Sequence, residues 1–236
     1  MKLGLFDLDH TLLPIDSADS WSYFLVHAGK LDADEYGARI REFARTYKAG
    51  GFDVAAYLAF QMGLLARFPR AQLQGWRDQF IEEHVAPHVR PEAIELINSH
   101  RAGGFTLALV TGTHAFVTRP IADLLGLDHL LAVQPEEIDG RFTGNYVGTH
   151  TYQDGKVRAV ENFLAARGAS LSTLEDSVFY SDSINDLPLL ERVRRPVVTN
   201  GDAKLRALAA ERGWPTLELF QKMGPDPILP NPILHA

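Results

Sequence analysis

Residues 1–11, MKLGLFDLDHT, place two aspartates at the end of a short apolar run. The run from Met1 to Phe6 is typical of a buried strand. Side chains alternate along a strand, so Asp7 and Asp9 should point the same way, about 6–7 Å apart. Two carboxylates at that spacing repel each other unless positive charge joins them. A metal ion, a phosphate-binding site or both would therefore explain the pair.

The composition is that of a globular protein with room for one large domain, or for a core and a subdomain, in its 236 residues. The net charge of −7 disfavours a nucleic-acid or anionic-membrane partner. The absence of cysteine excludes disulfides, thiolate zinc sites and thiol nucleophiles. The N-terminus does not resemble a signal peptide, and no apolar run reaches the roughly 20 residues of a membrane span. We therefore expect a soluble, cytoplasmic protein.

Strands and helices alternate along most of the chain, which predicts an α/β fold with a doubly wound, Rossmann-like parallel sheet. Strands are expected at 1–9, 105–110, 130–133, 177–180 and 196–198, a hairpin at 138–152, and helices at 93–101, 116–125, 156–167, 188–193 and 203–212. The block from 17 to 89 has helical periodicity and predicts about four helices without a strand. It interrupts the sheet just after the first strand, as an inserted cap would.

The predicted organisation is a discontinuous core of residues 1–15 and 90–220, a helical cap of residues 16–89 and a proline-rich tail of residues 221–236. The tail is expected to be extended or disordered. We expect the aromatic residues of the cap to form its interior rather than to contact a substrate. These residues are Trp21, Tyr23, Tyr57 and Phe60.

In doubly wound sheets, ligands bind beyond the carboxyl ends of the strands, where the candidate residues of this chain lie. Hydrolysis of a phosphate monoester needs a nucleophile and an acid that later acts as a base, and Asp7 and Asp9 are candidates. Lys156 could offset the charge of the transferring group. A hard cation, Mg²⁺ above all, would take oxygen ligands such as Asp182. Thr111 could donate its hydroxyl, and its loop could donate backbone N–H groups.

The motifs occur in a recognisable order: Asp7-Leu-Asp-His-Thr, then Thr111-Gly-Thr, then Lys156, then Ser181-Asp-Ser-Ile-Asn-Asp186. They are similar to the four motifs of the haloacid dehalogenase superfamily, and the resemblance covers residues 3–220. The helical insertion between the first two motifs resembles the phosphoserine phosphatase-like branch. Ser181 departs from the family pattern, which usually has glycine before the metal-binding aspartate.

The resemblance implies a role for each residue in the reaction. Asp7 would form an aspartyl-phosphate, and Asp9 would act as the acid and base. Thr111 and Lys156 would hold the phosphoryl group, with Gly112 in the same loop on the substrate side.

The resemblance also implies a Mg²⁺ site. Asp7, the backbone carbonyl of Asp9 and Asp182 would hold the ion. Asp186 would support either the metal site or the motif lysine, and Asn185 would reach the substrate. Structural roles remain open at this point: the carboxylates could cap helices, and the lysine could lie on the surface.

Two positions of the cap bear on the substrate. Phosphoserine phosphatases bind the substrate amine with an acidic residue nine positions after the nucleophile, and Asp16 occupies that position here. They bind the substrate carboxylate with an arginine in a segment resembling S-L-R-x-R-V. The matching segment here is Tyr57-Leu-Ala-Phe-Gln61-Met, which lacks both arginines and has Gln61 at the carboxylate-binding place. An amide cannot replace a bidentate guanidinium.

These two positions therefore predict a substrate that has a phosphate and an amine but no carboxylate. Histidinol phosphate fits that description. Some relatives that resemble this chain at D-L-D-H-T-L-L (residues 7–13) and Y-S-D-S-x-N-D-L-P-L-L (residues 180–190) are histidinol-phosphatases. Phosphoserine phosphatase activity and phosphotransfer to an alcohol remain alternatives. A receiver-like signalling module is disfavoured because it would lack Asp9 and the helical block. We expect a small-molecule partner, no nucleic acid and no membrane, with a monomer and a dimer both open.

Overall fold

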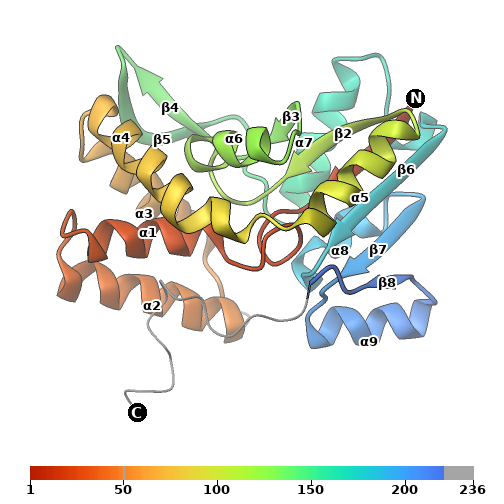
Figure 1. Ribbon diagram of the computed structural model, residues 1–236, viewed down its shortest axis with the longest axis horizontal. Helices are drawn as coiled ribbons and strands as arrows, with labels where there is room; N and C mark the ends of the chain where they lie inside the picture. The colour runs from red at the N-terminus through yellow and green to blue at the C-terminus, as the bar shows by residue number, and fades with distance from the viewer. Residues whose placement is uncertain (50, 221–236) are drawn as a thin grey trace. The chain divides into compact units, whose positions relative to one another are not determined.

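The computed structural model describes residues 1–49 and 51–220 (Figure 1). The described chain divides into two compact units. The first unit contains residues 1–15, 88–134 and 148–220, and the second contains residues 16–87 and 135–147. The tail that the sequence analysis expects at 221–236 lies outside the described residues.

A six-stranded sheet in the order β3-β2-β1-β6-β7-β8 forms the centre of the first unit. Every neighbouring pair in it is parallel. The strands are β1 (Lys2–Phe6), β2 (Phe105–Val110), β3 (His129–Leu131), β6 (Asp176–Ser181), β7 (Arg195–Thr199) and β8 (Thr216–Leu217). The predicted doubly wound α/β core is confirmed, with β1 between β2 and β6.

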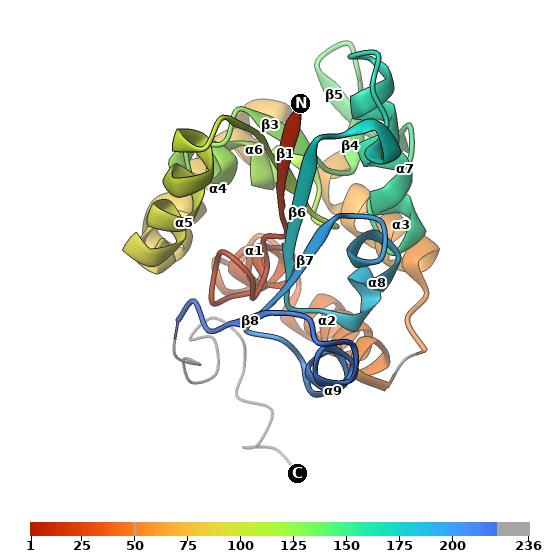
Figure 2. The same cartoon turned by 90° about the vertical axis from the view of Figure 1, so that its right-hand side faces the viewer.

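Helices cover both faces of this sheet (Figure 2). They are α5 (Pro91–Ala102), α6 (Ala115–Leu124), α7 (Asp154–Ala165), α8 (Leu187–Leu190) and α9 (Ala203–Arg212), with short 3-10 turns η2 (Ala86–His88), η3 (Leu171–Thr173) and η4 (Ile184–Asp186). Figure 2 shows α5 on one side of the sheet and α7 and α8 on the other. Each helix connects one strand to the next parallel strand, as such a sheet requires.

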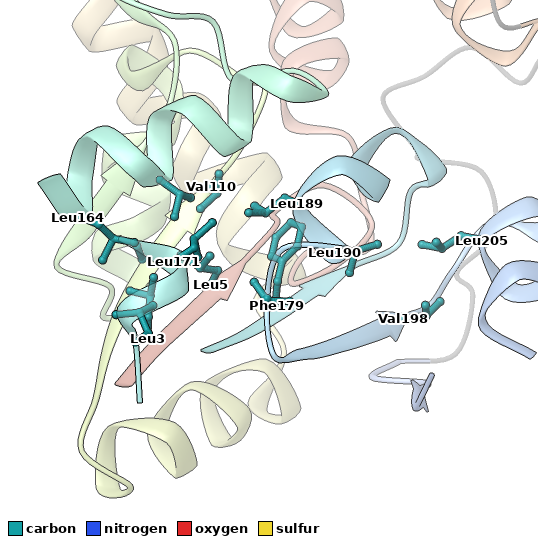
Figure 3. Packing of buried hydrophobic residues seen from close by; sticks show 14 of the residues in the cluster. Leu3, Leu5, Val110, Leu164, Leu171, Phe179, Leu189, Leu190, Val198 and Leu205 are labelled. Atoms are coloured by element: carbon teal, nitrogen blue, oxygen red, sulfur yellow. The ribbon is translucent and has the colours of Figure 1, made fainter. Parts of the chain in front are cut away.

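Strand β1 sends alternate side chains to the two helical layers. Leu3 and Leu5 are fully buried in a hydrophobic cluster that includes Val160 of α7 (Figure 3). Phe6 faces the other layer, where its ring stacks on Tyr180 with centroids 5.3 Å apart. A strand buried on both faces explains why the sequence of β1 is apolar without alternation from Leu3 to Phe6.

The second unit is built from helices and one hairpin. Its elements are α1 (Ser17–His27), α2 (Ala33–Ala49), α3 (Val54–Ala66), α4 (Arg70–Phe80), a π-helical turn η1 (Ile81–Val85), β4 (Gln134–Ile138) and β5 (Arg141–Val147). Aromatic rings fill its interior, with Trp21 fully buried and 5.5 Å from the ring of Phe80. Tyr23 and Phe60 are also buried, and Tyr57 is half-buried.

The hairpin differs from its predicted position. Its turn is Asp139-Gly140, with φ of 50° and 73°, which suits the two-residue turn that the sequence indicates. Its strands, however, span 134–147 rather than 138–152, because Gln134-Pro-Glu-Glu has little β propensity of its own. The hairpin packs on α3 in the second unit, although the predicted core segment included it.

Among the described helices, none is both long enough and apolar enough to cross a membrane.

A prediction concerns Gly155, in the first turn of α7. A Cβ atom there would lie 2.1 Å from the carbonyl oxygen of His150 and 2.7 Å from its Nδ1. We expect Gly155→Ala to lower the free energy of unfolding by about 1–3 kcal/mol, because backbone must move to admit the methyl group. Urea denaturation followed by circular dichroism measures this change.

Gly75→Ala is the matched control. Gly75 lies in α4, and nothing would approach a Cβ there within 4 Å. Alanine should stabilise this helix by about 0.5–1 kcal/mol. Equal effects of the two substitutions would contradict the close packing at Gly155.

Candidate active site

The alternation of β1 determines where Asp7 points. Leu3 and Leu5 face α7, so the next residue in phase, Asp7, lies on the same side. Its side chain is buried, and its backbone N–H donates to the carbonyl of Tyr180 in β6 at 3.0 Å. The strand thus brings a carboxylate to the carboxyl end of the sheet, beside the start of α7.

Lys156 meets Asp7 from α7. Its Nζ donates to Asp7 Oδ1 and to Asp186 Oδ2, both at 2.6 Å, and only 4% of the residue is exposed. Burial alone would lower the pKa of this ammonium, but the carboxylates of Asp186 and Asp7 outweigh burial and raise it. Lys156 is therefore a permanently charged donor rather than a proton carrier.

Asp186 is held by two donors on one oxygen. Besides Lys156, the hydroxyl of Ser181 donates to its Oδ2 at 2.7 Å. Burial raises the pKa of Asp186 to about 6, while Lys156 opposes the rise. These hydrogen bonds hold Asp186 beside Lys156. Its role as a metal ligand stays a prediction. Ser181, the departure from the family pattern, here supplies a hydrogen bond that glycine could not.

Thr11 links the first motif to the last. Its hydroxyl lies 3.1 Å from Asp7 Oδ2 and 3.3 Å from Asp182 Oδ1, and it accepts the backbone N–H of Asp182 at 3.0 Å. Sequence reasoning did not select Thr11 as a site residue. Its place in the first motif was the available signal.

The second motif forms a compact loop after β2. The backbone N–H of Thr113 donates to Thr111 Oγ1 at 3.1 Å, which leaves the hydroxyl proton of Thr111 to be donated elsewhere. The hydroxyl of Thr113 donates to Asp9 Oδ2 at 2.9 Å. Thr151 donates to the carbonyl of Thr111, and a Cβ on Gly112 would lie at an ordinary 3.7 Å from the Thr151 carbonyl oxygen. Thr113 was also missed by the sequence analysis.

Asn185 lies in η4, between Asp182 and Asp186 in the chain. Its Oδ1 accepts a hydrogen bond from Gln153 Nε2 at 3.3 Å. Gln153 has a φ of 49° and ψ of −122°, a backbone conformation that non-glycine residues rarely adopt. The two loops that precede α7 and α8 are thus joined by this amide pair.

The two predicted substrate contacts of the cap have local partners in the second unit. Asp16 caps α1, and its Oδ1 accepts the N–H of Asp19 at 2.8 Å. Gln61 is 2% exposed, and its Nε2 donates to Ser22 Oγ at 3.1 Å. Both hydrogen bonds stabilise the helical unit, and substrate contact by either residue stays a prediction.

Negative charge exceeds positive charge in the first unit's site. Burial raises the pKa of Asp7, and the neighbouring charge of Asp9 raises it further, while Lys156 opposes the rise. Asp182 keeps some exposed surface, but burial of its carboxylate, with the charges of Asp7 and Asp186, raises its pKa well above the usual value. A bound cation would stabilise the charged forms of these buried, mutually repelling carboxylates.

The oxygen donors of this site are of the kind that Mg²⁺ takes as ligands. Within residues 1–49 and 51–220, no three His, Asp or Glu side chains form a ready-made metal cluster. Mg²⁺ commonly uses one or two carboxylates and keeps several waters. Asp7 Oδ2 and Asp182 Oδ1 both lie within hydrogen-bond distance of the Thr11 hydroxyl, which places the two carboxylates beside the same side chain.

Known proteins resemble this chain over nearly its whole length. A family model described as haloacid dehalogenase-like hydrolase matches residues 5–191. A histidinol-phosphatase from Neisseria meningitidis serogroup C (strain 8013) is 39% identical over 92% of this chain and 98% of that protein. A solved structure of a protein of unknown function from Bordetella pertussis Tohama I has a TM-score of 0.89 at 41% identity, covering 93% of this chain and 99% of that one. A substrate-bound phosphoserine phosphatase shares the fold, with a TM-score of 0.66 at 20% identity over 92% of each chain.

The excess of negative charge predicts a specific behaviour of Asp182→Asn. Without added metal, this variant should be more stable than the wild type by roughly 1 kcal/mol near neutral pH, because it removes a carboxylate that the folded protein disfavours. Since the pKa of Asp182 is raised on folding, the folded wild type takes up a proton as the pH falls, and the difference should shrink toward low pH. Thermal unfolding across pH 5 to 8 measures it.

Mg²⁺ should raise the melting temperature of the wild type and not that of Asp182→Asn. Asp128→Asn, at an exposed aspartate of the same unit, is the control and should leave both the stability and the response to Mg²⁺ unchanged. A variant at Asp182 that is less stable than the wild type without metal would contradict the charge argument.

Proposed function

Because the chain belongs to the haloacid dehalogenase-like hydrolase family and is a phosphatase, we propose that it hydrolyses a small, amine-bearing phosphate monoester with Mg²⁺, and that histidinol phosphate is the best candidate. The observation that carries the proposal is the buried contact of Lys156 with Asp7 and Asp186. It supports Asp7 as the nucleophile, because the positive charge of Lys156 opposes the rise in the pKa of Asp7 and its hydrogen bond orients the carboxylate.

This arrangement supports the first half of the proposed reaction. An oxygen of Asp7 attacks phosphorus, and the ester bond to the leaving oxygen breaks. Asp9 donates a proton to that oxygen, so the product leaves as an alcohol. The ammonium of Lys156 and the hydroxyl of Thr111 offset the charge on the phosphoryl oxygens. Mg²⁺, when bound through Asp7, the Asp9 carbonyl and Asp182, would supply further positive charge.

The second half reverses the role of Asp9. Water attacks the phosphorus of the aspartyl-phosphate, the bond to Asp7 breaks, and Asp9 takes the proton from the water. Lys156 is suited to both halves, since the raised pKa of its ammonium prevents it from losing a proton in either step. The reaction therefore needs one residue that changes protonation, Asp9, and one that does not.

The choice of histidinol phosphate rests on the cap residues and on the relative. Asp16 accepts the α1 capping bond through Oδ1, and we propose that its other oxygen accepts a hydrogen bond from the substrate amine. Gln61 has a neutral amide in place of a guanidinium, and its Nε2 already donates to Ser22, so it provides no cation for a substrate carboxylate. The relative from Neisseria meningitidis is named histidinol-phosphatase, and the similarity extends over 98% of its length.

Steady-state kinetics on histidinol phosphate and phosphoserine test the substrate. We expect kcat/KM to be about tenfold or more higher for histidinol phosphate, because binding a carboxylate without a cationic partner leaves it poorly solvated. Activity should require Mg²⁺ and be lost with EDTA. A preference for phosphoserine would refute the choice of substrate while leaving the phosphatase reaction in place. Release of inorganic phosphate in the presence of an acceptor alcohol separates hydrolysis from phosphotransfer.

Variants of the two aspartates test the mechanism. Asp7→Asn should lower kcat about 10³-fold or more, because the amide is a poor nucleophile. Asp9→Asn should lower it about 10²- to 10⁴-fold, the usual contribution of a general acid and base, and should allow the aspartyl-phosphate to accumulate. Circular dichroism checks that both variants fold, and Asp128→Asn serves as the active control. EDTA-sensitive activity that persists in Asp7→Asn would overturn the assignment.

A further inference from the structure

Thr113 stands between two groups of the proposed reaction. It lies in the loop between β2 and α6, and 5% of it is exposed. Its hydroxyl donates to Asp9 Oδ2 at 2.9 Å, and its backbone N–H donates to Thr111 Oγ1 at 3.1 Å. The parallel register of β1 and β2, which pairs Phe6 with Leu109, places the loops that follow these strands side by side.

The backbone around Asp9 is held, but a carboxylate can still rotate. The next residue, His10, has a φ of 59°, and its N–H donates to the carbonyl of Ile15 at 3.3 Å. These features fix the turn after β1. They do not restrict rotation about the side-chain bonds of Asp9. The hydrogen bond from the Thr113 hydroxyl to Oδ2 does so, because it holds that oxygen toward the loop of Thr113.

We propose that Thr113 is a positioning residue for Asp9: its hydroxyl binds Oδ2 and so directs Oδ1 to carry the proton in both half-reactions. This inference rests on the proposed phosphatase function and deepens it. In the first step the proton moves from Asp9 to the leaving oxygen as the ester bond breaks, and in the second it returns from water to Asp9. The proton of Thr113 stays on its own oxygen throughout. A general acid must lie within about 2.6–3.2 Å of its acceptor, so its orientation is part of the rate.

A purely structural role for Thr113 would have a different consequence from a positioning role. Protonation of the leaving group matters most when that group is a poor one, such as an alkoxide. A p-nitrophenolate leaves without assistance. Loss of correct positioning should therefore slow the hydrolysis of an alkyl phosphate selectively, whereas a distorted loop would slow both kinds of ester.

The test compares Thr113→Val, which keeps the shape and the backbone N–H, with Thr113→Ser, which keeps the hydroxyl. The readout is kcat/KM, which reports the step in which the leaving group departs, for histidinol phosphate or the best alkyl ester found and for p-nitrophenyl phosphate. Thr113→Val should lose about tenfold or more on the alkyl ester and less than about threefold on the aryl ester. Thr113→Ser should stay within about threefold of the wild type on both. Thr113→Ala provides the same comparison if the valine variant does not fold.

Each outcome decides the inference. An equal loss on the two esters, an alkyl-ester rate unchanged in Thr113→Val, or a serine variant as impaired as the valine variant would overturn the positioning role. These results would leave the phosphatase function standing as long as the wild type hydrolyses both esters and Asp7→Asn hydrolyses neither. A wild type inactive on both esters would instead refute the proposed function itself.

Discussion

The ammonium of Lys156, held between Asp7 and Asp186, is the interaction on which the first unit's site depends. Three separate parts of the fold meet there: the end of β1, the start of α7 and the turn after β6. Taking these charges out of water is costly, and removing one partner would leave the others buried without compensation. The site therefore tolerates little change in any of the three segments. Gly155, next to Lys156 at the start of α7, is also closely packed against His150.

The alternation of side chains along β1 and β6 determines both the hydrophobic core and the polar site. In β1, Leu3 and Leu5 pack under α7, and Asp7 continues the same face toward Lys156. In β6, Phe179 belongs to the same cluster, and Ser181 continues its face to reach Asp186. A shift of either strand by one residue would exchange core and site residues together. The pairing of Phe6 with Tyr180 thus fixes the core and the site at once.

Much of the fold was predictable because its signals are local. Apolar runs and helical periodicity predicted the helices of the first unit and every strand of its sheet except the two-residue β8, and the first motif marked Asp7 and Asp9. The missed features depend on distant pairings: Thr11 meets Asp182 across 171 positions of the chain, and Thr113 meets Asp9 across 104. The hairpin was misplaced because Gln134-Pro-Glu-Glu has little β propensity of its own, and its association with α3 is a tertiary contact that no local pattern encodes.

The surplus of carboxylates makes the charged site unfavourable for folding when no further positive charge is bound. Asp7 and Asp182 both have raised pKa values, because burial and mutual repulsion act against their charged forms. A phosphate ester is an anion and would add to this repulsion. Lys156 already pairs with two carboxylates, so its single charge can offset only part of the charge of the ester. Binding the ester therefore requires positive charge beyond that of Lys156. A cation beside Asp7 and Asp182 would also relieve the repulsion between these carboxylates and so stabilise the folded protein, which is the physical reason to expect one.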